Sequence, residues 1–415
     1  MRMMNPSLLS LAIAAGTFSH ATFAAEDFGN LISQGKVGID ARYRYEHVDQ
    51  DNALDHANAQ TLRTRLTLQS GKWYGLSALV EADNVARLGE AAYNDTRNGQ
   101  TDRSLVADPD GSEINQALLR YDQKLGSAVV GRQRINLDNQ RFVGGVAWRQ
   151  NEQTFDAVLG QLKPLDGLTL TYAYLDNINT IFGPDNGRFD NRTNPANIEG
   201  HSHLLNAQYV LRPELTVTAY HYLLGLDNLA LTAAGAYGTL SSKTSGLRLN
   251  GAVQGVSYVL EYAQQQDYAD NPQQLDSDYY LAELGYTLQG VQLKAGYEVL
   301  GGDDGPGNRA FQTPLATKHI FQGWADQFLT TPAAGVKDAY FGVTAPLLGG
   351  TLQAWYHDFR ADEGSSQYGE EIDLSYAHPI PGIKGLTGLV KYAGYDADEF
   401  AVDTDKLWLQ LQYVY

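Results

Sequence analysis

The feature that most constrains this chain is a strict two-residue alternation of apolar and charged side chains near its start. From position 37 to position 47, the odd positions carry Val, Ile, Ala, Tyr, Tyr and His, and the even positions carry Gly, Asp, Arg, Arg and Glu. This period is that of a β-strand with one apolar and one charged face. An arginine that faces lipid at the bilayer centre costs about 2–4 kcal/mol. In a membrane, the face with Arg42 and Arg44 must therefore line a lumen.

The same alternation recurs in the next two segments. Arg63 and Arg65 lie on one face of residues 59–69, opposite a row of leucines. Glu81 and Asp83 lie opposite the apolar face of residues 73–83. Continued along the chain, the pattern predicts eighteen strands, at residues 36–47, 59–69, 73–83, 113–121, 127–136, 153–162, 168–176, 202–211, 214–224, 242–252, 255–266, 278–288, 290–300, 336–346, 350–360, 367–377, 385–394 and 405–415.

The connections between these strands alternate between short and long. Short turns are typical of the periplasmic end of a bacterial outer-membrane barrel, and long loops of its external end. The fold class predicted is therefore all-β: a transmembrane antiparallel up-and-down barrel of 18 strands. The last segment, 407–415, alternates apolar and polar residues and ends on Tyr415. It resembles the terminal strand that the outer-membrane assembly machinery recognises, which makes that machinery an expected partner.

The ends and the composition agree with an exported membrane protein. Residues 1–24 have a positive start, a short apolar run and a small residue at position 24, which predicts a signal peptide. Residues 25–415 contain no linker and are expected to form a single barrel domain. The chain has no cysteine, so no disulfide holds it together. Outer-membrane lipid and lipopolysaccharide are the expected surroundings.

Arginines gather in the first part of the chain. The whole chain has 48 acidic and 30 basic residues, yet thirteen of its nineteen arginines precede residue 150. Alternation places seven of them on inward faces, and two more lie in the external connection 137–152, which could fold into the lumen. A cationic lumen would attract anionic solutes. The alternative is a salt-bridge network without selectivity. The candidate residues are Arg42, Arg44, Arg63, Arg65, Arg120, Arg132, Arg134, Arg141 and Arg149.

Other chemistries find less support. The only dense Ser/His segment is His201-Ser202-His203, and neighbours in a strand face opposite ways, so a hydrolase is a minor alternative. Acidic stretches at 303–304 and 396–405 could bind Ca²⁺ loosely, and otherwise no cofactor or metal is expected. The net charge of −18 disfavours nucleic acid as a partner, and none is expected. Inward-facing aromatic residues, including Trp355, could stack on sugar rings.

The stretch from Gly131 to Ala157 resembles the signature of the alginate export family of outer-membrane porins. The similar segments are Gly131-Arg132-Gln133, Asp138 to Gly144, Trp148 to Asn151 and Phe155 to Ala157, with Glu113 to Ala117 upstream. The resemblance implies a monomeric, eighteen-stranded pore whose arginine-rich lumen passes anionic polyuronate. It carries over to four of the candidates: Arg132, Arg134, Arg141 and Arg149.

Together these features predict a passive channel in the outer membrane of a Gram-negative bacterium, without enzymatic activity. Its expected solutes are anionic, with uronate-type oligo- or polysaccharides foremost. A general small-solute or sugar porin without uronate specificity is the alternative.

Overall fold

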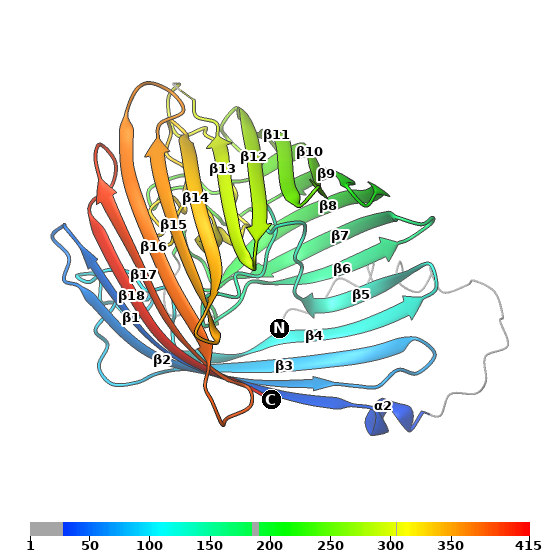
Figure 1. Ribbon diagram of the computed structural model, residues 1–415. Helices are drawn as coiled ribbons and strands as arrows, with labels where there is room; N and C mark the ends of the chain where they lie inside the picture. The colour runs from blue at the N-terminus through cyan, green and yellow to red at the C-terminus, as the bar shows by residue number, and fades with distance from the viewer. Residues whose placement is uncertain (1–27, 185–190, 304) are drawn as a thin grey trace.

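The computed structural model describes residues 28–184, 191–303 and 305–415, so the predicted signal peptide lies outside the described residues. Within them, eighteen strands form one antiparallel sheet, with a short helix α2 (Asn30–Ser33) and a 3-10 turn η1 (Lys318–Ile320) (Figure 1). The strands are β1 (Lys36–Gln50), β2 (Ala57–Gln69), β3 (Leu76–Arg87), β4 (Gly111–Gln123), β5 (Gly126–Gln133), β6 (Thr154–Leu162), β7 (Leu168–Asn179), β8 (Asn197–Arg212), β9 (Leu215–Leu224), β10 (Ser242–Val253), β11 (Val256–Asp267), β12 (Asp276–Leu288), β13 (Val291–Leu300), β14 (Val336–Leu347), β15 (Gly350–Arg360), β16 (Gln367–Pro379), β17 (Leu386–Ala397) and β18 (Thr404–Val414).

The sheet closes on itself. Strand β1 pairs with β2 on one side and with β18 on the other, where Asp40 is opposite Val414 and Gln50 is opposite Thr404. Each remaining strand pairs with its two neighbours in the chain. Closure leaves no unpaired strand edge, as lipid requires of a spanning β-structure. The predicted eighteen-stranded barrel is confirmed.

The alternation of short and long connections is confirmed for most of the barrel, but the external connections 51–56, 361–366 and 398–403 have six residues each, as many as the periplasmic turn 380–385. Four of the short turns have two consecutive residues with positive φ: residues 74 and 75, 254 and 255, 289 and 290, and 348 and 349. Two consecutive positive φ angles define a type I′ turn, whose twist matches that of the flanking strands. Glycine suits the second position because it has no Cβ to clash. The described parts of the long connections lie at the opposite end: 88–110, 134–153, 180–184, 191–196, 225–241, 301–303 and 305–335.

The two faces of the wall differ as predicted in the first three strands. Arg42, Arg44 and Glu46 in β1 are buried, and their sequence neighbours are the more exposed. In β2 Arg63 is fully buried, whereas Leu66 is 43% exposed on the outer face, where lipid would cover it. No helix in the described ranges is long and apolar enough to cross a bilayer.

The fifth and sixth strands contradict the predicted orientation. Phe155 and Ala157 in β6 are fully buried toward the interior, so Asp156 between them points outward. Arg132 is opposite Asp156 in the register and forms an ion pair with it at 2.8 Å. The prediction that Arg132 faces the lumen was therefore wrong. Charge alone did not mark the inward face, because an outward arginine beside a carboxylate is already neutralised. The inward polar residue is Gln133, whose amide donates to the carbonyl of Ala157 at 3.1 Å.

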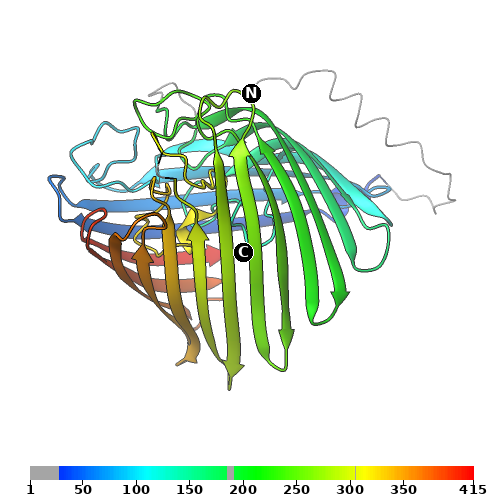
Figure 2. The ribbon, with the colours of Figure 1, turned by 90° about the horizontal axis from the view of Figure 1, so that it is seen from above.

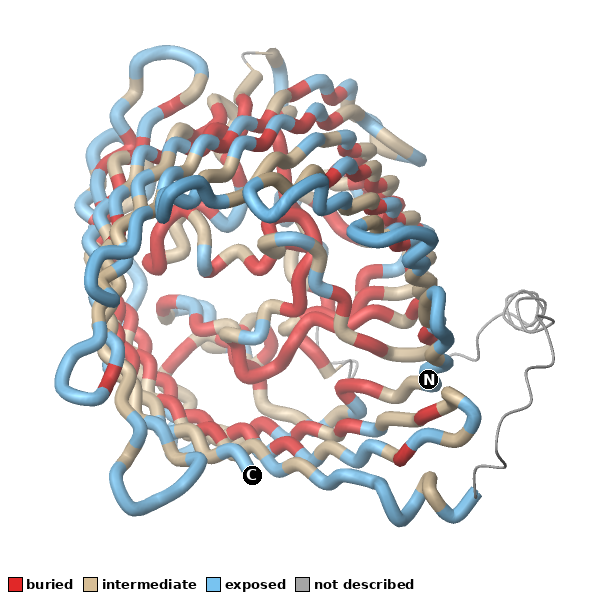
Figure 3. Tube along the Cα trace, turned by 45° about the vertical axis from the view of Figure 1, so that its right-hand side comes forward, coloured by how far each residue is buried: buried red, intermediate tan, exposed pale blue. Residues whose placement is uncertain are grey.

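The interior of the barrel is filled by chain. Figure 3 shows segments crossing the space that the strands enclose, and Figure 2 shows the yellow connection between β13 and β14 there. The largest cluster of buried apolar side chains joins wall residues such as Tyr220 and Leu281 to loop residues such as Phe142, Val143 and Phe311. The apolar core therefore lies inside the barrel, between wall and loops.

Candidate functional site in the barrel lumen

Two external loops meet inside the barrel. We name them L3 (residues 134–153) and L7 (residues 301–335). The amide of Gly144 in L3 donates to the carbonyl of Leu315 in L7 at 2.9 Å, and the amide of Thr317 donates back to the carbonyl of Gln140 at 3.0 Å. Buried Val143 and Leu315 pair there as a short β-bridge. The expectation that residues 137–152 could fold into the lumen is confirmed, and L7 joins them.

Arg42 fastens L3 to the wall. Its Nη1 donates to the carbonyls of Ala147, Trp148 and Arg149 at 3.2, 3.1 and 3.2 Å. These carbonyls belong to a turn whose own amides do not satisfy them, and a guanidinium is well suited to bind several at once. Arg42 therefore anchors the loop, and it is 7% exposed.

Arg65 and Arg134 share carboxylates with the root of L3. Arg65 forms two hydrogen bonds with Asp83, at 2.7 and 2.6 Å, and an ion pair with Glu152 at 2.5 Å. Arg134 bridges Glu81 and Glu152. Burial would raise the pKa of Glu152, but the two arginines outweigh burial and lower that pKa to about 2. The Arg134 side chain keeps 28% exposure, against 8% for that of Arg65.

Three more arginines, on β1, β2 and L3, are buried between the wall and L3. Arg44 donates to Gln410 at 2.7 Å and lies 4.0 Å from the ring centroid of Trp148. Arg63 forms an ion pair with Asp40 at 2.5 Å. Arg149 in L3 pairs with Glu46 at 2.7 Å. With Arg42, Arg65 and Arg134, six arginines lie among six carboxylates: Asp40, Glu46, Glu81, Asp83, Asp108 and Glu152. This network carries no net charge, which favours the salt-bridge alternative for its buried members.

The remaining candidates lie apart. Arg141, at the tip of L3, pairs with Glu298 of β13 at 2.8 Å and donates to Gln322 of L7 at 2.9 Å, so it joins both loops to the wall. Arg120 faces inward near the periplasmic end, with a side chain that is 46% exposed and paired with Asp122. Arg132 lies on the outer face, as described above. The nine predicted residues thus do not form one continuous ladder.

The sequence did not indicate the site that holds L7. The carboxylates of Glu371 and Asp373 in β16 accept the amides of Ala325 and Trp324, at 2.6 and 3.2 Å. They do so at a tight bend where Gly323 has φ +75°, and a Cβ there would overlap the Glu371 carboxylate. The alternation of β16 was visible, but nothing in the sequence related it to a loop fifty residues earlier.

The aromatic surroundings of Lys391 in β17 are the second feature that the sequence did not reveal. Its Nζ lies 2.7 Å from Nε2 of His319, 3.6 Å from the ring centroid of Trp324 and 4.2 Å from that of Trp148. His319 stacks on Trp148 with 4.6 Å between centroids. Burial lowers the pKa of His319 to about 3, so this imidazole is neutral at physiological pH. The buried amine of Lys391, enclosed by aromatic rings, thus links L3, L7 and the wall.

A comparison with models of protein families shows to which family the chain belongs. The family model described as alginate export matches residues 33–319. The chain belongs to the alginate export family. It is an outer-membrane channel of the porin type from a Gram-negative bacterium. The family and the similar solved structures are export channels and porins, not enzymes.

Solved structures of outer-membrane porins share the fold of this alginate export family member. OpdO of Pseudomonas aeruginosa aligns with a TM-score of 0.68 and 17% identity, over 94% of this chain and 99% of that one. OccAB4 of Acinetobacter baumannii aligns with a TM-score of 0.72 and 14% identity, over 92% and 98%. OccAB2 of the same organism aligns with a TM-score of 0.70 and 18% identity, over 93% and 99%. None of the curated protein sequences compared with the chain matches it.

In this alginate export family barrel, Ser202 and the neighbouring histidines are not arranged as the catalytic residues of a hydrolase. Ser202 is buried toward the interior, where it donates to the carbonyl of Gly225 at 3.3 Å. His201 and His203 are on the opposite face of β8 and contact Tyr174 and Tyr172. The serine and the two imidazoles thus lie on opposite sides of the wall.

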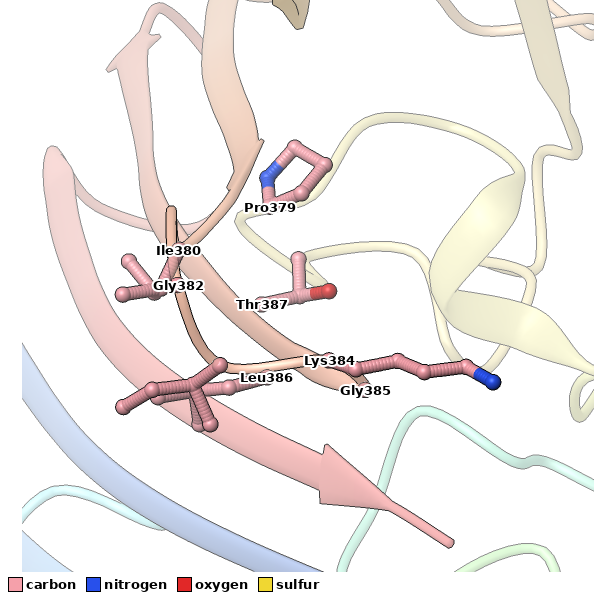
Figure 4. Close-up of a pocket in the computed structure, with 8 residues that line it drawn as sticks. Pro379, Ile380, Gly382, Lys384, Gly385, Leu386 and Thr387 are labelled. Atoms are coloured by element: carbon pink, nitrogen blue, oxygen red, sulfur yellow. The ribbon is translucent and has the colours of Figure 1, made fainter.

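The acidic loops and the surface pocket add no further site. In the described residues no group of three or more His, Asp or Glu side chains is arranged to hold a metal. The predicted loose Ca²⁺ binding stays a prediction; Asp304 lies outside the described residues, and Asp303 pairs with Arg309. Figure 4 shows a pocket formed by the periplasmic turn between β16 and β17, lined mostly by apolar residues and glycines with Lys384 as its charged group. It lacks the converging polar groups of a solute site.

Proposed function

We propose that this channel passes anionic solutes of the uronate type by passive diffusion. The family match and the inward-folded loops support a channel with a narrowed lumen. The preference for anions would come from a few accessible cations, because the buried arginines are neutralised by carboxylates. Diffusion needs no cofactor, and the direction of transport follows the solute gradient.

The observation that carries this proposal is the position of Arg134. It lies at the root of L3, faces inward, and keeps 28% of its side chain exposed while Glu81 and Glu152 hold it in place. A guanidinium so oriented can offer its remaining donors to a passing carboxylate. Since it is already shared by two carboxylates, the contact is weak enough to release the solute.

The proposal is tested by reversal potential and by oligouronate block of single channels in planar bilayers. Arg134→Gln should weaken block roughly fivefold, the effect of about 1 kcal/mol expected for one partly exposed ion pair. Arg132→Gln is the matched control, because Arg132 faces outward and should leave block unchanged. The double variant Arg134→Gln with Glu152→Gln keeps the net charge. Block that is as strong in this double variant as in the wild type would contradict a direct role of Arg134.

A general solute or sugar porin is the second candidate. It is favoured by the equal numbers of arginines and carboxylates in the six-arginine network described above, because paired charges remove the net field that would select anions. The two candidates differ in one measurement. A wild-type channel that is blocked equally by a neutral oligosaccharide and by an oligouronate of the same length is a sugar porin.

A further inference from the structure

Aromatic rings lie flat on the inner wall at positions where the neighbouring strand has a glycine. The ring of Trp355 in β15 covers Gly342 of β14, and the ring of Tyr340 in β14 covers Gly296 of β13. A Cβ at either glycine would overlap the ring above it. The glycines thus make room for each ring to lie against the sheet, with its open face toward the lumen.

This arrangement leaves the Trp355 and Tyr340 rings partly exposed. A third ring on the wall, Tyr220 of β9, lies over Gly246 in the same way, but Phe142 of L3 packs on it at 5.2 Å and it is 4% exposed. Tyr220 is therefore part of the loop packing. Trp355 and Tyr340 present a surface that their own fold does not fully cover.

A cation and an anion lie at the edge of these rings. Lys294 of β13 has a side chain that is 43% exposed, with its Nζ 6.0 Å from the Trp355 ring centroid. Glu283 of β12 forms an ion pair with Lys294 at 3.1 Å and accepts a hydrogen bond from the Tyr340 hydroxyl at 2.8 Å. Glu283 therefore fixes both neighbours, while Lys294 keeps donors free toward the lumen.

We propose that Trp355, Tyr340 and Lys294 form a subsite for one uronate sugar of a passing chain. The C–H face of a pyranose packs on the aromatic rings, and its carboxylate binds Lys294 at their edge. The aromatic rings favour a sugar over a small inorganic anion, because only the sugar has an apolar face to pack on them. The adjacent Lys294 favours a uronate over a neutral hexose, because only the uronate carries a carboxylate. This inference rests on the proposed function and names a second contact, on the wall opposite the Arg134 side.

The test is block of single-channel current by a short oligouronate, compared with a neutral oligosaccharide of the same length. Trp355→Leu should weaken oligouronate block roughly two- to tenfold, as expected for losing one aromatic stacking contact. Lys294→Gln should weaken oligouronate block and leave neutral block unchanged. Tyr356→Leu is the matched control, because Tyr356 is on the outer face of the same strand.

A variant that keeps the tryptophan separates stacking from folding. Gly342→Ala should lift the Trp355 ring off the wall and weaken block as Trp355→Leu does, with a normal closed barrel by gel mobility. Equal block in the wild type, Trp355→Leu and Gly342→Ala would overturn the subsite while leaving the proposed function intact. Failure of the oligouronate to block the wild type would instead overturn the proposed function.

Discussion

At the scale of the residue, Arg42 shows how an inward arginine can serve structure rather than selectivity. Its Nη1 donates to three successive carbonyls of L3. Arg42→Met keeps the length of the side chain and removes the donors. Buried hydrogen bonds to a charged group contribute about 1.5–3 kcal/mol, so the variant should release this part of L3 while the eighteen-stranded wall stays closed.

The readout for Arg42→Met is single-channel conductance, which should become larger and noisier as L3 moves. Arg120→Met is the control, since Arg120 lies near the periplasmic end and contacts Asp122 rather than L3. Indistinguishable traces from Arg42→Met and the wild type would show that L3 does not depend on this residue.

Arg42 and Arg132 also show how far the orientation of a single side chain can be predicted from the sequence. The orientation of Arg42 was predictable because it is one of four charged residues at successive even positions, 40 to 46. The orientation of Arg132 was not, because its strand is short and carries glutamine on one face and arginine on the other. Both are polar, and only the register with Asp156 and the buried Phe155 decides between them. Whether an inward arginine is free or paired was beyond the sequence in every case.

At the scale of the element, L3 should respond to acid through Glu152. The folded pKa of this carboxyl, about 2, lies below its ordinary 4.5. A depressed pKa contributes stability that is fully present above the ordinary value and is lost as pH falls toward the folded value. The shift corresponds to about 3 kcal/mol, as an order of magnitude. L3 should therefore stay fixed from pH 7 to 5 and loosen progressively below pH 4.5.

Channel noise recorded between pH 7 and pH 3 tests this dependence. Glu152→Gln cannot titrate, so it should remove the acid-induced step and show moderate noise at all pH values. An identical acid profile in the wild type and in Glu152→Gln would assign the transition to other carboxyls.

Elements differ in how far the sequence predicts them. The strands and type I′ turns follow from local pattern, since alternation and pairs such as Gln254-Gly255 depend on neighbours in the chain. The places of L3 and L7 depend on distant partners: Asp373 of β16 for Trp324, and Leu315 for Gly144. No local rule relates these positions, so the loops that narrow the lumen were predicted by length alone.

At the scale of the whole molecule, closure fixes which face of every strand meets lipid. Leu66 and Thr67 are adjacent in β2 and point to opposite sides of the wall. Leu66 is 43% exposed and lies opposite Ile39 and Ala82 on the outer face. Thr67 points inward, where its hydroxyl donates to Glu81 at 2.7 Å.

One substitution made at each of these two positions tests the assignment of faces. Leu66→Arg places a charge on the apolar outer face and should lower the free energy of unfolding by up to about 2–4 kcal/mol, the cost of an arginine at the bilayer midplane. Thr67→Arg places the same charge beside Glu81 in the lumen and should cost much less, because the carboxylate can pair with it. Urea titration of folding into lipid vesicles, followed by the heat-modifiable mobility of the barrel, gives both values. Equal losses of folding free energy would mean that the two positions share one environment. This result would contradict the assignment of Leu66 to the lipid face and of Thr67 to the lumen.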